Sequence, residues 1–134
     1  MRLEPEWVPI EDVLFAVLFA HDRLIAEYGG LAGVRRSLLE SALARPIHQF
    51  HYRRARSVFS LAAAYGYGII KDHPFVDGNK RTAFASMFIF LDLNGFTLDP
   101  AEDEIVEAMV AVAEGKRAEL WLARWAKRHS SPCK

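Results

Sequence analysis

Apolar side chains recur at intervals of three or four residues along most of the chain, which places them on one face of an α-helix. The periodicity predicts helices over residues 10–28, 57–71, 79–93, 100–114 and 117–128. A further short helix is predicted to begin near Ser37 and to end at Pro46, because proline interrupts a helix interior. No stretch shows the alternation of apolar and polar residues that a half-buried strand requires. The pattern therefore predicts one all-α domain of six helices over residues 1–134.

Local residue choices mark the ends of several of these helices. Gly29-Gly30 is expected to stop the first helix, and Asn94-Gly95 is expected to cap the fourth. Ser37 and Glu40 fit a capping box at the start of the second helix. The segment over 46–56, which is rich in aromatic and basic side chains, is predicted to be a loop or flap.

Two helices carry information about packing. The helix over 79–93 is apolar nearly all round, so it is predicted to be central and buried. Gly66 and Gly68 lie inside the preceding helix, where glycine is destabilising, and they predict a close crossing with another helix. The longest apolar run, 83–91, is about half as long as a membrane span requires, so no membrane association is expected.

Composition narrows the class of protein. Apolar residues make up 51% of the chain and charged residues 25%, which is ordinary for a globular domain. The formal net charge is zero, so no overall field attracts nucleic acid, and direct nucleic-acid binding is not expected. The single cysteine, Cys133, cannot form an internal disulfide, is expected to lie in a frayed tail and is given no role. With an N-terminus that does not resemble a signal peptide, this predicts a cytoplasmic protein.

The stretch HPFVDGNKRT, residues 73–82, departs from the ordinary charge pattern of a helix. It is predicted to be a loop that runs into the helix over 79–93, and it places Lys80 and Arg81 in the first turn. A helix N-terminus carries partial positive charge and unpaired N–H groups, so acidic residues are expected there and cations are not. The two cations and the first amide groups would together form an anion hole that suits phosphate.

Three neighbouring residues add chemistry to this hole. Asp77 beside a phosphate is reasonable if Mg²⁺ lies between them, because Mg²⁺ is held by one or two carboxylates together with phosphate oxygens. Gly78 permits a tight turn or a close approach of ligand. Histidine changes charge near neutral pH, so His73 is the candidate general base. Each residue alone is most often an ordinary surface or helix-end residue, but their occurrence together favours a nucleotide phosphate site.

Other candidate motifs are weaker. A Walker A loop is excluded, because Asn79 precedes Lys80 and a helix rather than a strand comes before the loop. His48 and His51 have the spacing of metal ligands but lack a third ligand nearby in the sequence. His21 is expected to be a packed or surface residue of the first helix.

Residues 73–81 resemble the core motif of the Fic/Doc family, HxFx(D/E)GN followed by Gly or Lys and then Arg. The stretch over 29–46 is similar to the segment that precedes the flap in Doc-type proteins, and the chain length suits a minimal Doc domain. Lys80 and Phe84 are Doc-like, because Fic proteins that transfer AMP have glycine and arginine at these positions.

The resemblance implies a compact six-helix Fic/Doc fold and a Doc-type toxin. Such a protein uses ATP and Mg²⁺ to phosphorylate a Thr or Ser hydroxyl of a translation factor, elongation factor Tu, and arrests translation. By position, it implies a catalytic base at His73 and a magnesium ligand at Asp77. It implies an ATP phosphate site at Gly78, Asn79, Lys80 and Arg81. The flap, placed at 46–56, would dock the target by its backbone.

The chain lacks the (S/T)xxxE(G/N) motif of self-inhibiting Fic proteins. The resemblance therefore implies control by a separate Phd-like antitoxin whose helix covers the active site. Two alternatives remain: AMP transfer to a protein hydroxyl, and a catalytically silent Fic-like module that binds a partner or helps an antitoxin to bind DNA. Lys80 and Phe84 count against the first alternative, and the intact His73 and Asp77 count against the second.

Overall fold

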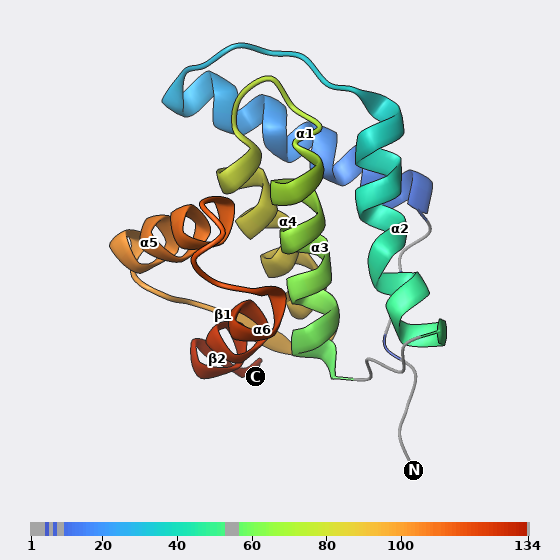
Figure 1. Cartoon of the computed structure of the whole chain (residues 1–134), viewed down its shortest axis with the longest axis vertical. Helices are drawn as coiled ribbons and strands as arrows, with labels where there is room; N and C mark the ends of the chain where they lie inside the picture. The colour runs from blue at the N-terminus through green and yellow to red at the C-terminus, as the bar shows by residue number, and fades with distance from the viewer. Residues whose placement is uncertain (1–4, 6, 8–9, 53–56, 134) are drawn as a thin grey trace.

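The computed structural model describes residues 5, 7, 10–52 and 57–133 (Figure 1). In this part of the chain the order of elements is α1 (Ile10–Tyr28), α2 (Arg36–Tyr52), α3 (Val58–Asp72), α4 (Asn79–Leu93), β1 (Phe96–Leu98), α5 (Glu102–Ala113), α6 (Glu119–Arg128) and β2 (Ser130–Pro132). The prediction of a six-helix, all-α domain is confirmed, with one small two-stranded sheet in addition. No helix of the described part is long and apolar enough to cross a membrane.

α3 is the central helix of the fold, and it packs against α2, α4 and α6 (Figure 1). Its buried residues include an unbroken run from Leu61 to Gly66. α4 packs on α3 and buries one side, but Phe88 and Ile89 on its other side are each 38% exposed. The expectation that the helix over 79–93 is buried nearly all round is corrected accordingly. The loop over residues 73–78 therefore connects the buried helix α3 to the half-buried helix α4.

Gly66 and Gly68 mark two close helix crossings, as the sequence predicted. A Cβ atom added at Gly66 would lie 2.5 Å from Sδ of Met87 on α4. A Cβ atom added at Gly68 would lie 3.3 Å from the main-chain oxygen of Ala42 on α2. Glycine therefore allows α3 to approach two neighbours more closely than any other residue would. These crossings set the position of α3 relative to α2 and α4, and therefore the position of the loop that follows α3.

α2 continues through Pro46 to Tyr52, so the predicted helix end at Pro46 is wrong. A proline inside a helix costs about 3 kcal/mol. Pro46 and Phe50 are both buried, and burial of the phenyl ring alone contributes roughly 1.5–3 kcal/mol. Tertiary packing thus offsets the local cost. Residues 46–52 are helix rather than the predicted loop, and residues 53–56 lie outside the described residues.

The start of α2 also differs from the prediction. The N–H groups of Leu38 and Leu39 both donate to the carbonyl of Arg35, at 3.1 Å each. The helix therefore begins at Arg36, before Ser37, and the capping box predicted at Ser37 and Glu40 is wrong. By contrast, α1 ends at Gly29 as predicted, where the N–H donates to the carbonyl of Ile25 over 2.8 Å and φ is 86°.

The C-terminal residues form a strand that the sequence pattern did not predict. β1 and β2 pair antiparallel, with Phe96 opposite Pro132 and Leu98 opposite Ser130. The N–H of Cys133 continues the pairing to the carbonyl of Gly95 over 2.8 Å. The expectation of a frayed tail at Cys133 is therefore wrong. Strands of three residues are too short to show a period-two pattern, so the periodicity could not reveal them.

Candidate functional site

His73 ends α3 in a backbone conformation that side chains other than glycine rarely adopt. Its φ and ψ are 51° and 56°, and no other non-glycine residue of the described part has a positive φ. Its N–H donates to the carbonyl of Ile69 over 3.0 Å, and Pro74 disfavours a right-handed helical conformation at His73. The left-handed form costs roughly 1–2 kcal/mol, so the surrounding loop must hold His73 in place. Its side chain is exposed to solvent.

Asn79 closes the loop from the α4 side. Its Oδ1 accepts from the N–H of Phe75 over 3.0 Å, and its Nδ2 donates to the carbonyl of Phe75 over 2.8 Å. The Phe75 ring is buried in the core, whereas Val76 is 54% exposed. Both polar groups of the Asn79 side chain are thus engaged by Phe75. The phosphate contact of Asn79 stays a prediction, and its main-chain N–H is the group left to make it.

α1 holds the same loop from the other side through His21. This side chain is 3% exposed, and its Nε2 lies 2.7 Å from the main-chain oxygen of Asp77. Sequence reasoning assigned His21 no role. The signal that could have revealed it is its place on the apolar stripe of α1, four residues after Val17 and seven after Leu14, both of which are buried.

The segment between α1 and α2, residues 29–35, runs across the loop and pairs with it (Figure 1). Arg35 N–H donates to the carbonyl of Pro74 over 2.8 Å, and Val76 N–H donates to the carbonyl of Gly33 over 3.0 Å. The sequence placed a flap at 46–56 instead. For residues 46–52 that position is contradicted, because they are helical and the 17 residues of α2 carry residue 52 roughly 25 Å from the helix start, whereas residues 53–56 lie outside the described residues.

The first turn of α4 has the geometry expected for the predicted anion hole, and phosphate binding there stays a prediction. Gly78 precedes it with a φ of 86° and provides no side-chain cap, and the first turn contains no acidic residue. The first helical bond runs from Thr82 N–H to the carbonyl of Gly78 over 3.0 Å. The N–H groups of Asn79, Lys80 and Arg81 therefore make no hydrogen bond to any described residue. Three free amide donors at the positive end of a helix dipole attract an anion.

A cavity of about 290 Å³ opens directly onto this turn. Residues 78–81 line one side of it, and the apolar side chains Ile105, Val106, Met109 and Val110 of α5 line the other. Lys80 is exposed, and the Arg81 guanidinium lies 4.1 Å from the ring centroid of Tyr28 on α1. The cation–π contact orients Arg81 without neutralising it. The cavity thus combines an anion hole with an apolar wall, which suits a nucleotide.

Asp77 lies beside the hole and is the candidate metal ligand. Its Oδ2 accepts from the N–H of Leu31 over 2.7 Å, and its Oδ1 has no hydrogen-bond partner among the described residues. No group of three or more His, Cys, Asp or Glu side chains that could hold a metal by themselves occurs in the described part. A single available carboxylate oxygen fits Mg²⁺, which takes one or two protein carboxylates and completes its shell with phosphate oxygens and water.

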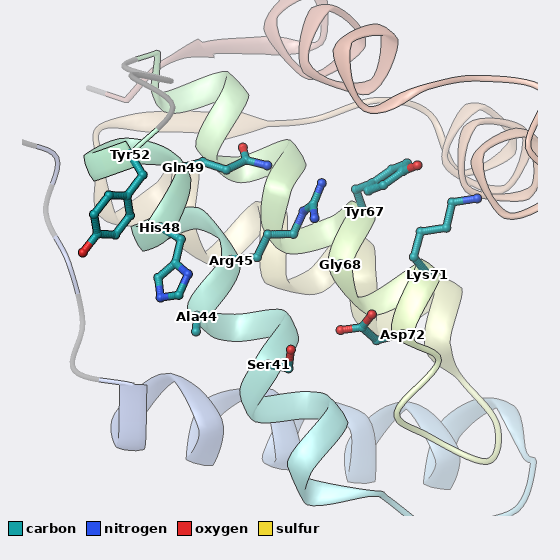
Figure 2. A pocket seen from close by; sticks show the side chains of 10 residues that line it. All are labelled: Ser41, Ala44, Arg45, His48, Gln49, Tyr52, Tyr67, Gly68, Lys71 and Asp72. Atoms are coloured by element: carbon teal, nitrogen blue, oxygen red, sulfur yellow. The ribbon is translucent and has the colours of Figure 1, made fainter.

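A separate pocket of about 420 Å³ lies between α2 and α3 (Figure 2). Arg45 forms an ion pair with Glu119 of α6, and Gln49 Nε2 donates to the other carboxylate oxygen over 3.0 Å. These contacts tie α2 to α6. His48 lines this pocket and His51 does not, so the two histidines do not converge on one site.

Comparison with known proteins identifies the family of the chain. Residues 14–91 match the Fic/DOC family. The chain is 36% identical over 110 residues to Toxin Doc of Mycolicibacterium smegmatis, which covers 73% of this chain and 76% of that protein. It is 32% identical over 97 residues to Protein kinase doc of Escherichia phage P1, which covers 72% of this chain and 76% of that protein. The chain therefore belongs to the Fic/Doc family.

Proposed function

We propose that this chain is a Doc-type toxin that phosphorylates a Thr or Ser hydroxyl of a translation factor and arrests translation in the cytoplasm. Elongation factor Tu is the expected target. The names of the two relatives, Toxin Doc and Protein kinase doc, support this proposal. The observation that carries it is the first turn of α4, where Lys80, Arg81 and three free amide groups meet no acidic residue.

The residues of the loop divide the work of phosphoryl transfer. Mg²⁺, when bound, neutralises negative charge on the ATP phosphates. Asp77 holds this ion, and the α4 amides with Lys80 and Arg81 hold the phosphate oxygens. His73 accepts the proton of the target hydroxyl while the hydroxyl oxygen forms a bond to the γ-phosphorus. The bond from the γ-phosphorus to the bridging oxygen breaks, and ADP leaves with that oxygen.

The target segment docks along residues 31–35, in place of the 46–56 flap that the sequence indicated. Gly33 and Arg35 supply the hydrogen bonds to the loop, so the N–H and carbonyl of Val34 point to the outer edge of the pair. An extended peptide adds readily to such an edge. Leu31, which is 67% exposed, borders this edge beside Asp77 and offers an apolar contact to the residues that flank the hydroxyl.

A groove next to the anion hole fits the antitoxin. It has a volume of about 500 Å³ and is lined mainly by apolar side chains of α1, α4 and α5, among them Leu24, Phe84, Phe88 and Ile89. Arg81 lines both this groove and the anion hole. The apolar face of an amphipathic helix from a Phd-like antitoxin would fill the groove and cover Arg81. This arrangement accounts for restraint of the toxin without a self-inhibitory motif.

Paired labelling tests the activity. The purified protein is incubated with Mg²⁺ and bacterial lysate, with ATP labelled at the γ-phosphate in one sample and at the α-phosphate in the other. The proposal expects γ-label on a band that comigrates with elongation factor Tu, and no label with His73→Ala. α-Label on protein would establish AMP transfer and overturn the argument from Lys80. Absence of both labels, with purified elongation factor Tu added, would favour the silent binding module.

Co-expression tests the antitoxin groove. Expression of the toxin should arrest growth, and co-expression of its Phd-like antitoxin should relieve the arrest. Ile89→Glu places a charge in the apolar groove and should abolish this relief. Leu120→Glu is the matched control, because Leu120 is 58% exposed on α6 and lies outside the groove. Equal relief of both variants would contradict the assignment of the groove.

A further inference from the structure

His21 is a buried polar residue that the proposed mechanism does not use. Four polar side chains are buried in the described part, and the other three, Asn79, Thr82 and Ser86, all belong to α4. His21 alone comes from α1, and it lies 56 positions before its hydrogen-bond partner in the sequence. A buried imidazole needs a specific partner to offset the loss of solvation. Its partner is the loop that carries the site.

The hydrogen bond defines which nitrogen of His21 carries a proton. Nε2 lies 2.7 Å from the main-chain oxygen of Asp77. A carbonyl oxygen can only accept, so Nε2 must donate. The imidazole plane also stacks on the Phe75 ring, with 3.9 Å between centroids and 14° between planes. One face and one edge of His21 are thus committed to two residues of the loop.

Gly78 extends the same contact. A Cβ atom added there would lie 3.2 Å from Cδ2 and 3.3 Å from Nε2 of His21, which is closer than side chains normally approach. The positive φ of Gly78, 86°, brings the chain against the imidazole in this way. Phe75, Asp77 and Gly78 therefore all rest on one side chain of α1. Gly78 directly precedes the first turn of α4, so the imidazole contacts the backbone from which the anion hole is built.

Asp77 is held at two points as a result. Its carbonyl accepts from His21, and its Oδ2 accepts from the N–H of Leu31. The first bond fixes the Asp77–Gly78 peptide, and the second fixes the carboxylate. Without the first bond the peptide can rotate, and the carboxylate and the α4 amides then lose their relative orientation. Outer partners of this kind typically change metal affinity or activity by about 10–100-fold.

We propose that His21 is a positioning residue that orients the Asp77 carboxylate and the first α4 amides toward one shared metal–phosphate group. The inference rests on the proposed function of the same site and adds to it the residue that holds the site together. His21 touches neither substrate nor phosphate. It acts through the Asp77 carbonyl, and its contribution depends on a donated hydrogen bond rather than on a change of charge.

Three variants separate the hydrogen bond from packing. His21→Phe keeps a ring on Phe75 but removes the donor. His21→Gln removes the ring but keeps an N–H donor at a similar distance from the backbone. His48→Phe is the control, because His48 is an exposed histidine of α2 that touches no loop residue. Circular dichroism and thermal unfolding establish that each variant is folded before any comparison.

The readouts are Mn²⁺ binding in the presence of ATP, followed by electron paramagnetic resonance, and the kinetics of phosphoryl transfer. His21→Phe should weaken Mn²⁺ binding by about 10–100-fold and lower kcat to a similar extent, with KM for the protein substrate unchanged. His21→Gln should recover most of the loss, and His48→Phe should match the wild type. Wild-type Mn²⁺ affinity and kcat in folded His21→Phe would overturn the inference.

A second measurement decides the inference if His21→Phe does not fold. ¹⁵N spectra of the wild-type imidazole distinguish the two neutral tautomers. A proton on Nε2 is expected, and a neutral ring with its proton on Nδ1 would overturn the inference. Failure of the wild type to bind Mn²⁺ with ATP would refute the proposed function instead. The tautomer would then remain the test of His21.

Discussion

Replacement of Asn79 by Ala tests whether this side chain holds the loop or only binds phosphate. The family resemblance places Asn79 among the phosphate ligands. The structure shows its amide engaged by both main-chain groups of Phe75, at 3.0 and 2.8 Å. Ala removes both bonds and leaves the N–H and the carbonyl of Phe75 buried. We call these two hydrogen bonds the Asn79 clamp. If the clamp holds the loop closed, its loss should make the loop open more often even when no nucleotide is present.

The size of the effect follows from those two groups. An unsatisfied buried donor or acceptor costs about 1–3 kcal/mol. For the two main-chain groups of Phe75 together, this gives about 2–6 kcal/mol. Val76 and Asp77, which follow Phe75, are exposed, so water can reach the opened loop and reduce the cost to the lower part of that range. The free energy of loop opening should therefore fall by about 2–4 kcal/mol. At 1.36 kcal/mol per factor of ten, exchange of the Phe75 amide hydrogen should accelerate by roughly 30- to 900-fold.

Hydrogen exchange without ATP measures this directly, with the Phe75 amide as the reporter. Asn94→Ala is the matched control, because Asn94 caps the other end of α4 through a bond from Nδ2 to the carbonyl of Phe90 over 2.9 Å. The control should affect the C-terminal end of α4 and leave Phe75 unchanged. Wild-type exchange of the Phe75 amide in Asn79→Ala would refute the clamp. Loss of ATP binding alone would then assign Asn79 to phosphate contact.

Three further predictions concern stability. Gly66→Ala places a Cβ atom 2.5 Å from Sδ of Met87, so it should lower the free energy of unfolding in urea by about 1–3 kcal/mol, and the loss in the double variant with Met87→Ala should be smaller than the sum of the two single losses. Burial raises the pKa of Tyr65 to about 12, so the stability present below the unfolded pKa near 10 should be lost as pH rises toward 12, by up to about 3 kcal/mol; urea unfolding of Tyr65→Phe should show no such decline. Glu119→Ala removes the partner of Arg45 and Gln49, which are partly exposed, so the loss should be about 1–2 kcal/mol by the same assay, and an unchanged midpoint would contradict the α2–α6 tie.

The sequence predicted the helices from the periodicity of their apolar residues, and it predicted the position of the candidate site from its motif. α1 and α4 have the bounds that periodicity and the glycine signals indicated. His73, Asp77 and the first turn of α4 were predictable for a local reason: they are close in the sequence, and cations at a helix N-terminus conflict with its dipole. Local physics is sufficient to recognise such a conflict.

The errors at Pro46 and at the flap share a different cause, which is contact between distant parts of the chain. Proline ends most helices by local rules, yet Pro46 lies inside α2 because that helix is buried against α3. The same contacts decide where the flap lies. Residues 46–56 have a loop-like composition, but the segment that covers the motif is 29–35, and only the bonds from Gly33 and Arg35 to the loop reveal this.

The site therefore consists of two groups of residues, one close together in the sequence and the other distant from it. The groups to which the proposed function assigns chemistry lie within nine consecutive residues, from His73 to Arg81, and their spacing matches the family motif. The groups that orient them come from α1 and the segment after it, namely His21 and Leu31, whose bonds to Asp77 span 56 and 46 positions. A motif can be read without the fold, but the strained backbone at His73 and the direction of the Asp77 carboxylate depend on it. A substitution at His21 that leaves the motif intact should therefore impair the site as a substitution within the motif would.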